Sequence, residues 1–348
     1  MVPGIEGLAT IGGKTQAILP PDRFLDDKPD VVKYILRLEK LAGLPPGTWK
    51  ANKMLLAKYR SAAWVQLAPA DEPVGLYRSN VPIEPPTAAR CRAAAARGLD
   101  WLRGVQKPDG SFSYEYYPYA NAYEATRYNV VRHAGTAFSL FAGVRLRLGS
   151  RRGAGDPKLS SLDLAKDPNF AAGERALAYI RSVSVKSKRF GFVYVPDGTK
   201  VKLGAVALSL VAFCERERAG GDRANREMMK GMADFIRKQQ TPEGEFISHY
   251  DPDKGMPIKR FVSLYYPGES LLGLLRLYRL GGKEDAKLLD ACHLGAKYLI
   301  GFERRQAADN LKKGVKPGRV YPPDAWFMQA LEELIDLDQA VSEWAMEA

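Results

Sequence analysis

Cysteine and histidine are scarce: the 348 residues contain three of each. Cys91, Cys214 and Cys292 form no Cys-x-x-Cys pair and leave an odd thiol, which argues against a zinc ribbon and a disulfide framework. Cys292 and His293 are adjacent, but neighbouring residues on a helix point in different directions and make no chelating pair. We therefore expect neither a metal site nor a cofactor.

The sequence also lacks a run of 18 apolar residues, so no membrane-spanning helix is predicted. Residues 1–4 show neither the basic nor the apolar region of a signal peptide. The chain as given is therefore typical of a cytoplasmic protein, and export would require a signal upstream of Met1.

A deficit of acidic residues, 40 against 52 Lys and Arg, gives a formal net charge of +12. The basic residues are scattered and no standard nucleic-acid module is present, so nucleic acid is not an expected partner. With 46% apolar and 26% charged residues, the composition is that of a folded globular chain.

The clearest internal feature is a repeat. Residues 101–116 align with 235–250 at a constant offset of 134. The coinciding residues are Gln106, Pro108, Gly110, Phe112 and Tyr116 with Gln240, Pro242, Gly244, Phe246 and Tyr250. Each copy predicts a helix end, a Pro/acid/Gly turn and a short extended piece.

Helices that are apolar on most faces follow these loops and begin near Gly135, Gly204 and Gly268. Such helices are buried, whereas the patterns over 171–183, 226–239 and 286–300 are amphipathic. Alternating buried and amphipathic helices predict an all-α fold, an α/α toroid, with the starts of the inner helices and their hairpin-like loops at one rim.

The chain is expected to divide near residue 86. Residues 1–86 are predicted to form an irregular arm, covering 1–30, and a helical pair over 31–42 and 51–67. Residues 82–86 read as a linker, and 87–348 form the toroid domain, with a last helix from Pro322, Pro323 and Asp324 onward.

The turns Gln106-x-x-Asp109-Gly110-Ser111-Phe112 and Gln240-x-x-Glu243-Gly244-x-Phe246 resemble those of α/α toroid proteins. This group includes six-hairpin glycosidases, uronate lyases, epimerases, and the squalene-cyclase and prenyltransferase superfamily. The resemblance covers about residues 90–345 and implies architecture more than chemistry. The Asp-rich motif of terpene cyclases and the zinc site of protein prenyltransferases are not reproduced.

A polar cluster precedes the first inner helix. Asn129 and His133 are four residues apart, so they share a helix face if the helix has begun there, with Arg132 beside them and Tyr128 adjacent. Asn129 and Arg132 would bind a uronate carboxylate, and His133 or Tyr128 would move the proton. The alternative is structural: His133 caps or hydrogen-bonds a helix start.

A second candidate set lies at the later helix starts. Glu269 and Asp324 would complete the acid–base set, since two carboxyl groups across a cleft are the minimum for glycoside hydrolysis. Glu269 in a first turn is also ordinary helix-dipole chemistry. The remaining candidates would contact substrate, as a cation or as stacking rings: Lys202, Tyr116, Tyr250, Tyr265 and Trp326.

The sequence therefore predicts a carbohydrate-active enzyme, a lyase, epimerase or hydrolase that acts on a uronate-bearing or other anionic glycan. A non-catalytic toroid that binds a glycan or a protein is the first alternative. An isoprenoid-handling relative, with a deep apolar cavity, is the second. The oligomeric state is left open.

Overall fold

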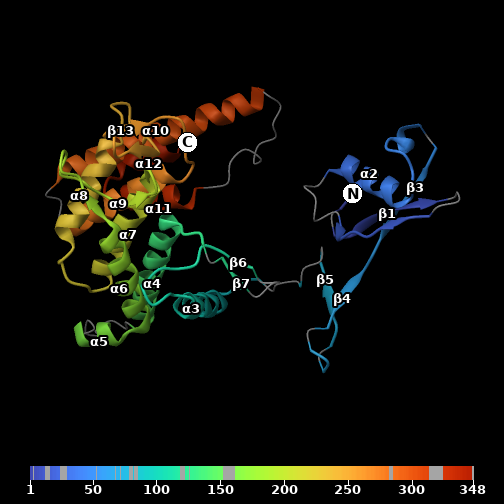
Figure 1. Ribbon diagram of the computed structural model, residues 1–348, viewed down its shortest axis with the longest axis horizontal. Helices are drawn as coiled ribbons and strands as arrows, with labels where there is room; N and C mark the ends of the chain where they lie inside the picture. Colours follow the sequence, from blue (N-terminus) through green and yellow to red (C-terminus); the bar gives the residue numbers. More distant parts are fainter. Residues whose placement is uncertain are drawn as a thin grey trace. The chain divides into compact units, whose positions relative to one another are not determined.

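The computed structural model describes residues 1–348 apart from 3, 12–15, 24–29, 52, 67, 71, 78–80, 82–84, 118–121, 125, 152–160, 282–284, 313–323 and 347–348. The side chains of 148–151, 161–163, 306–311 and 344–346 also lie outside this description. Chain contacts divide the protein into two compact units, residues 1–91 and 92–348 (Figure 1). Pro322 and Pro323 of the predicted last helix start fall outside the described residues.

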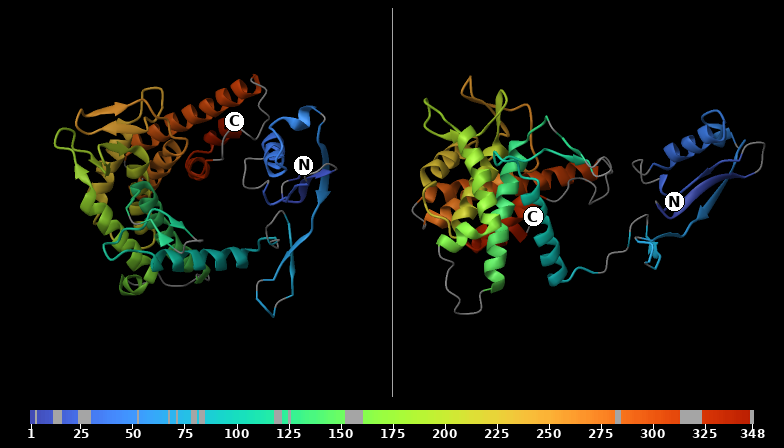
Figure 2. Two further views of the ribbon diagram at one scale, coloured as in Figure 1. Left: turned by 45° about the vertical axis from the view of Figure 1, so that its right-hand side comes forward. Right: turned by 60° about the horizontal axis from the view of Figure 1, so that its bottom comes forward.

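The N-terminal unit is built on an antiparallel sheet in the order β2-β1-β3. Its helix α2 lies over one face of that sheet (Figure 2). The core contains Leu8, Tyr34 and Leu38, and the Tyr34 hydroxyl donates to the carbonyl oxygen of Leu19 at 2.8 Å. The elements are β1 (Glu6–Ile11), β2 (Ile18–Leu19), α2 (Val31–Leu41), the 3₁₀ helix η1 (Thr48–Ala51), β3 (Leu55–Arg60), β4 (Ala63–Val65) and β5 (Val74–Leu76).

The sheet corrects two predictions. Residues 1–30 are not simply irregular, because β1 and β2 pair there, and 51–67 is not a helix, because it contains η1, β3 and β4. Of the predicted helical pair only α2 forms. The apolar residues over 54–65 are compatible with both helical and strand periodicity. Residues 55–60 form a strand because β3 pairs with β1, which lies 44 or more residues away in the sequence.

The unit of residues 92–348 consists of helical hairpins in two layers. Outer helices are α3 (Ala88–Gly104), α6 (Pro168–Val183), α8 (Arg226–Lys238) and α10 (Ala286–Lys312). Inner helices are α4 (Val130–Arg151), α7 (Leu203–Arg218), α9 (Tyr266–Gly281) and α11 (Ala325–Ile335). Two short helices, α5 (Ser161–Lys166) and α12 (Ala340–Met346), complete the unit. No described helix is long and apolar enough to cross a bilayer.

The inner helices pack in the order α4-α7-α9-α11. α7 and α9 are buried along most of their length, as their nearly all-round apolar sequences predict. The first and last helices of the row also meet, since the rings of Phe138 and Trp326 lie 5.7 Å apart in an edge-to-face contact. Inner and outer helices therefore form the layered arrangement that the alternation predicts.

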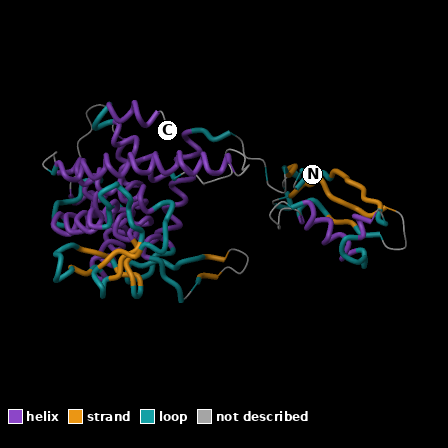
Figure 3. Tube along the Cα trace, turned by 90° about the horizontal axis from the view of Figure 1, so that it is seen from above, coloured by secondary structure: helices purple, strands orange, loops and turns teal. Residues whose placement is uncertain are grey.

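Short strands gather at one end of the helices, the rim, where the inner helices begin (Figure 3). They follow the outer helices α3, α6 and α8, and they position the side chains at the starts of α4, α7 and α9. The strands are β6 (Tyr116–Tyr117), β7 (Ala122–Tyr123), β8 (Val185–Lys186), β9 (Val193–Tyr194), β10 (Pro196–Asp197), β11 (Lys200–Lys202), β12 (His249–Asp251) and β13 (Met256–Ile258).

The repeated turn joins successive outer helices. Gln106 Nε2 donates to the carbonyl oxygen of Ala172 in α6 at 2.9 Å, and Gln240 Nε2 donates to that of Ala291 in α10 at 2.9 Å. Gly244 has φ 101°, and a Cβ there would lie 2.5 Å from the Leu294 carbonyl oxygen. The Gln and Gly of the motif are thus required for packing, which explains why the motif predicts architecture.

Candidate functional site

Glu269 is the most buried carboxyl group at the rim. It lies in the first turn of α9, a helix whose start is fixed by Ser263 Oγ, which accepts from the backbone N–H of Tyr265 and Tyr266 at 3.2 Å. Glu269 is 3% exposed, and its Oε2 has no hydrogen-bond partner among the described residues. Burial, and then the charge of Asp324, raise its pKa to about 8.

Asp324 lies next to Glu269, at the start of α11. Its Oδ1 accepts from the backbone N–H of Trp326 at 3.0 Å and caps the helix, and its Oδ2 contacts Gly268 so closely that a Cβ there would overlap it. Burial raises the pKa of Asp324 to about 6, although its backbone hydrogen bonds act in the opposite direction. Two carboxyl groups with separated pKa values therefore lie on neighbouring inner helices.

An ion pair closes another side of this region. Lys202 Nζ lies 2.6 Å from Asp197 Oδ2, so the predicted substrate-binding cation already has an anionic partner. β11 pairs Lys202 with His249 of β12, and His249 stacks on Phe261 with ring centroids 4.6 Å apart. Burial, followed by the charges of Lys200 and Lys202, lowers the pKa of His249.

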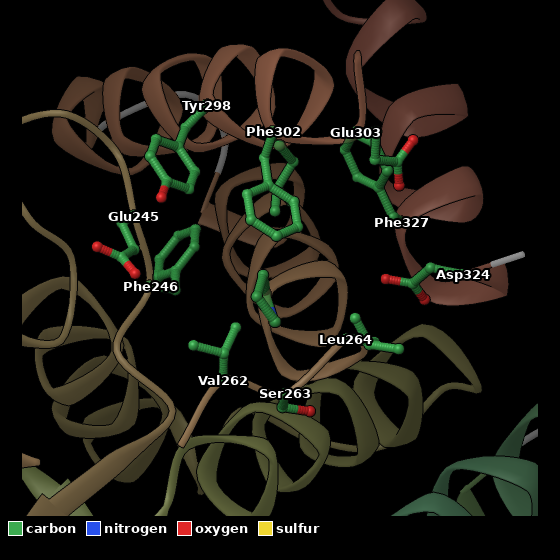
Figure 4. Close-up of a pocket in the computed structure, with 12 residues that line it drawn as sticks. Glu245, Phe246, Val262, Ser263, Leu264, Tyr298, Phe302, Glu303, Asp324 and Phe327 are labelled. Atoms are coloured by element: carbon green, nitrogen blue, oxygen red, sulfur yellow. The ribbon is translucent and has the colours of Figure 1, made fainter. Parts of the chain in front are cut away.

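A pocket opens beside Asp324, between α9, α10, α11 and the segment 262–264. Figure 4 shows Asp324 pointing toward it, with the rings of Tyr298 and Phe302 on the α10 side. Its charged lining residues among those described are Glu245, Glu303 and Asp324. The full lining is Glu245, Phe246, Val262, Ser263, Leu264, Pro267, Tyr298, Leu299, Phe302, Glu303, Asp324 and Phe327.

The cluster predicted around residue 133 does not join Glu269 and Asp324. His133 is 2% exposed, its Nε2 lies 3.0 Å from the Ala176 carbonyl oxygen of α6, and its ring stacks on Tyr179 at 5.1 Å. Burial lowers the pKa of His133 to about 4. The His133 side chain is turned toward the outer layer and contacts α6, as the structural alternative expects, and its catalytic role stays a prediction.

Its neighbours are also occupied. Asn129 Oδ1 accepts from the backbone N–H of Arg132 at 3.1 Å, which caps α4. The guanidinium of Arg132 lies over the Tyr114 ring at 4.8 Å, and Tyr128 packs edge-to-face on His133 at 5.7 Å. None of these contacts involves Glu269 or Asp324. The carboxylate-binding and proton-moving roles of Asn129, Arg132 and Tyr128 therefore stay predictions.

The predicted stacking rings differ in exposure. Tyr250 is 2% exposed within an aromatic cluster that includes Phe192 and Phe235, so it cannot stack on a sugar. Tyr116 packs against Trp101 and Tyr123, and Trp326 packs against Phe138. Tyr265 is 39% exposed.

Sequence reasoning named Tyr265 and missed its neighbour Tyr266. The Tyr266 ring and Glu269 Oε2 both lie against Gly204 at the start of α7. Burial, Glu269 and Asp197 raise the pKa of Tyr266 to about 12. The signal was the position three residues before Glu269, which places both side chains on one face of the helix.

Among the described residues no group of three or more His, Cys, Asp or Glu side chains is arranged to hold a metal ion. The chemistry that these residues offer is proton transfer: a carboxyl group that is mostly protonated at pH 7 beside one that is mostly ionised.

Solved structures similar to this chain include two described as sugar epimerases and one described as a sugar isomerase. A sugar epimerase from a ruminal bacterium matches with a TM-score of 0.49 and 14% identity, over 73% of this chain and 68% of that chain. A cellobiose 2-epimerase from Spirochaeta thermophila DSM 6192 matches with a TM-score of 0.42 and 15% identity, over 72% of this chain and 71% of that chain. A D-mannose isomerase matches with a TM-score of 0.41 and 14% identity, over 62% and 54%.

At 14% or 15% identity, and with TM-scores below 0.5, these matches are a likeness of fold. No family model matches this chain. No curated protein matches it either.

Proposed function

We propose that residues 92–348 form a carbohydrate-active enzyme that uses Glu269 as general acid and Asp324 as general base. The observation that carries the proposal is the placement of two carboxyl groups at the starts of adjacent inner helices: Glu269 is buried with no hydrogen-bond partner at Oε2 among the described residues, and Asp324 lines a pocket. Their surroundings raise the pKa values to about 8 and about 6. Between these values Glu269 holds a proton to give and Asp324 is free to take one. Proton exchange of this kind serves sugar epimerisation, isomerisation and glycoside hydrolysis alike.

The charge of the site favours a neutral sugar as substrate. The charged residues that line the pocket within the described part of the chain are carboxylic acids, and Lys202 is already paired with Asp197. An anionic substrate would meet like charges there, which costs affinity. The uronate predicted from the sequence depended on Arg132 and Asn129, which are engaged elsewhere.

Aromatic and apolar side chains beside Asp324 support a ring-shaped, partly apolar ligand. Phe246, Tyr298, Phe302 and Phe327 line the pocket, and the C–H faces of sugars pack well on such rings. A pocket that combines these rings with a few convergent polar groups is the usual form of a small-molecule site.

The test is turnover on a panel of neutral mono- and disaccharides and matched uronates, followed by NMR in D₂O. Solvent deuterium on sugar carbon reports epimerisation or isomerisation, and new reducing ends report hydrolysis. We expect product from a neutral sugar, and a loss of about 10²- to 10⁴-fold in kcat/KM for Glu269→Gln and for Asp324→Asn.

Glu227→Gln is the matched control, because its side chain is 90% exposed on the outer helix α8. It should keep wild-type rates. Wild-type rates in Glu269→Gln would show that Glu269 is not the general acid. Sugar binding with no turnover by the wild type would make the protein a glycan-binding toroid instead.

A further inference from the structure

The start of α7 presents a bare backbone to Glu269. Gly204 is buried in the first turn of α7, and a Cβ at this position would lie 2.5 Å from Glu269 Oε2 and would overlap the Tyr266 ring. A side chain of any other residue would therefore displace the carboxyl group or the ring. The absence of a side chain lets both groups pack directly on the α7 backbone.

Tyr266 is placed to cover the carboxyl group. It is the first residue of α9, three residues before Glu269, so the two side chains lie on the same helix face one turn apart. Its ring is half-buried and also contacts Phe261, with centroids 6.4 Å apart. The ring, Gly204 and Glu269 thus form one packed group between α7 and α9.

The charged groups around this packed group come from three other elements. Asp324 faces Glu269 from the start of α11, and its charge raises the pKa of Glu269. Asp197 of β10 acts on Tyr266 and is paired with Lys202 of β11, the residue that precedes α7. Glu269 Oε2 has no hydrogen-bond partner among the described residues. Exclusion of water is therefore the main control on the protonation of this carboxyl group.

We propose that Tyr266 is a positioning residue for Glu269: its ring covers the carboxyl group against Gly204 and keeps water from it. The proposal deepens the proposed function, because it assigns a residue that holds the general acid in its proton-carrying form. The phenolic oxygen is not needed for this role, since the covering surface is the ring. Tyr265, 39% exposed, has no such role.

The experiment is a ¹³C NMR titration of the Glu269 side-chain carboxyl group in the full chain, assigned with Glu269→Gln. Tyr266→Ala should lower the Glu269 titration midpoint by about one pH unit or more, because water reaches the carboxylate. Tyr266→Phe keeps the ring and should leave the midpoint within about 0.3 unit. Tyr265→Ala is the matched control and should not move it.

Circular dichroism shows whether each variant is folded, and Tyr266→Leu replaces Tyr266→Ala if the latter does not fold, with a smaller downward shift expected. An unchanged midpoint in the truncated variant would overturn the proposal, as would an equal shift in Tyr266→Phe. The titration needs no substrate, so its failure is distinct from failure of the proposed function, which Glu269→Gln turnover decides.

Discussion

The two ends of the inner helices treat buried charge in opposite ways. At the base, where the inner helices end, Glu215 is 1% exposed and forms two ion pairs. Its Oε1 lies 2.6 Å from Arg145 Nη1, and its Oε2 lies 3.3 Å from Arg276 Nη1. Arg276 also reaches Glu333 of α11 at 3.0 Å, so four inner helices share one ion-pair network. At the rim, Glu269 is almost as buried but has no cation beside it among the described residues.

This difference indicates a structural role for the charges at the base and fits the chemical role proposed for the rim. Buried charges that are mutually paired hold helices in register and stay ionised. A buried carboxyl group without a cation is driven toward its neutral form, which destabilises the ionised protein at neutral pH and creates a group that can donate a proton. The rim therefore carries an energetic cost that packing does not explain and that the proposed proton transfer would explain.

A large effect on stability that does not depend on Glu269 is expected at the base. Glu215→Ala leaves Arg276, with a side chain 7% exposed, short of a partner, so we expect a loss of about 3 kcal/mol in the free energy of unfolding. Urea denaturation at pH 7 measures it. Glu227→Ala, at an exposed position, should change stability by less than about 0.5 kcal/mol. Equal small losses in both variants would show that the network stabilises nothing.

The rim should show an effect on stability that depends on pH. The pKa of Glu269 is about 8 in the folded chain and 4.5 in the unfolded reference, so the folded state binds more protons between these values. Stability conferred by the protonated group is complete below about pH 4.5 and is lost as pH rises to about 8, by up to about 1.4 kcal/mol per unit.

The glutamine side chain of Glu269→Gln cannot ionise, so this variant does not lose stability in this way as pH rises. The variant should gain stability relative to wild type from pH 5 to pH 8, and the gain should level off above pH 8. Denaturation curves at each pH unit give the comparison. Parallel pH dependence in the two proteins would mean that Glu269 titrates normally.

Sequence alone predicted the layers and the rim, because helical periodicity and the repeated Gln/Gly turn are local signals. It also predicted that Glu269 and Asp324 lie at helix starts. Non-local contacts decide what the sequence does not show: strand β3 needs β1 as a partner, and the His133 side chain turns outward to α6. Spacing shows which residues share a face, but packing against the next helix decides what that face meets.

The choice between Tyr265 and Tyr266 shows the same limit. Tyr265 precedes α9 and Tyr266 is its first residue, and only the close approach of α7 at Gly204 selects Tyr266 as the residue beside Glu269. A glycine at a helix start is visible in the sequence, but the residue that fills the space in front of it is not.

The most direct measurement is the pH dependence of kcat/KM on the neutral sugar that the panel identifies. The account predicts a bell-shaped profile with an acid limb near pH 6 from Asp324 and a basic limb near pH 8 from Glu269. The residual activity of Glu269→Gln should lack the basic limb. A basic limb that persists unchanged in that variant would contradict the assignment of Glu269 as the proton donor.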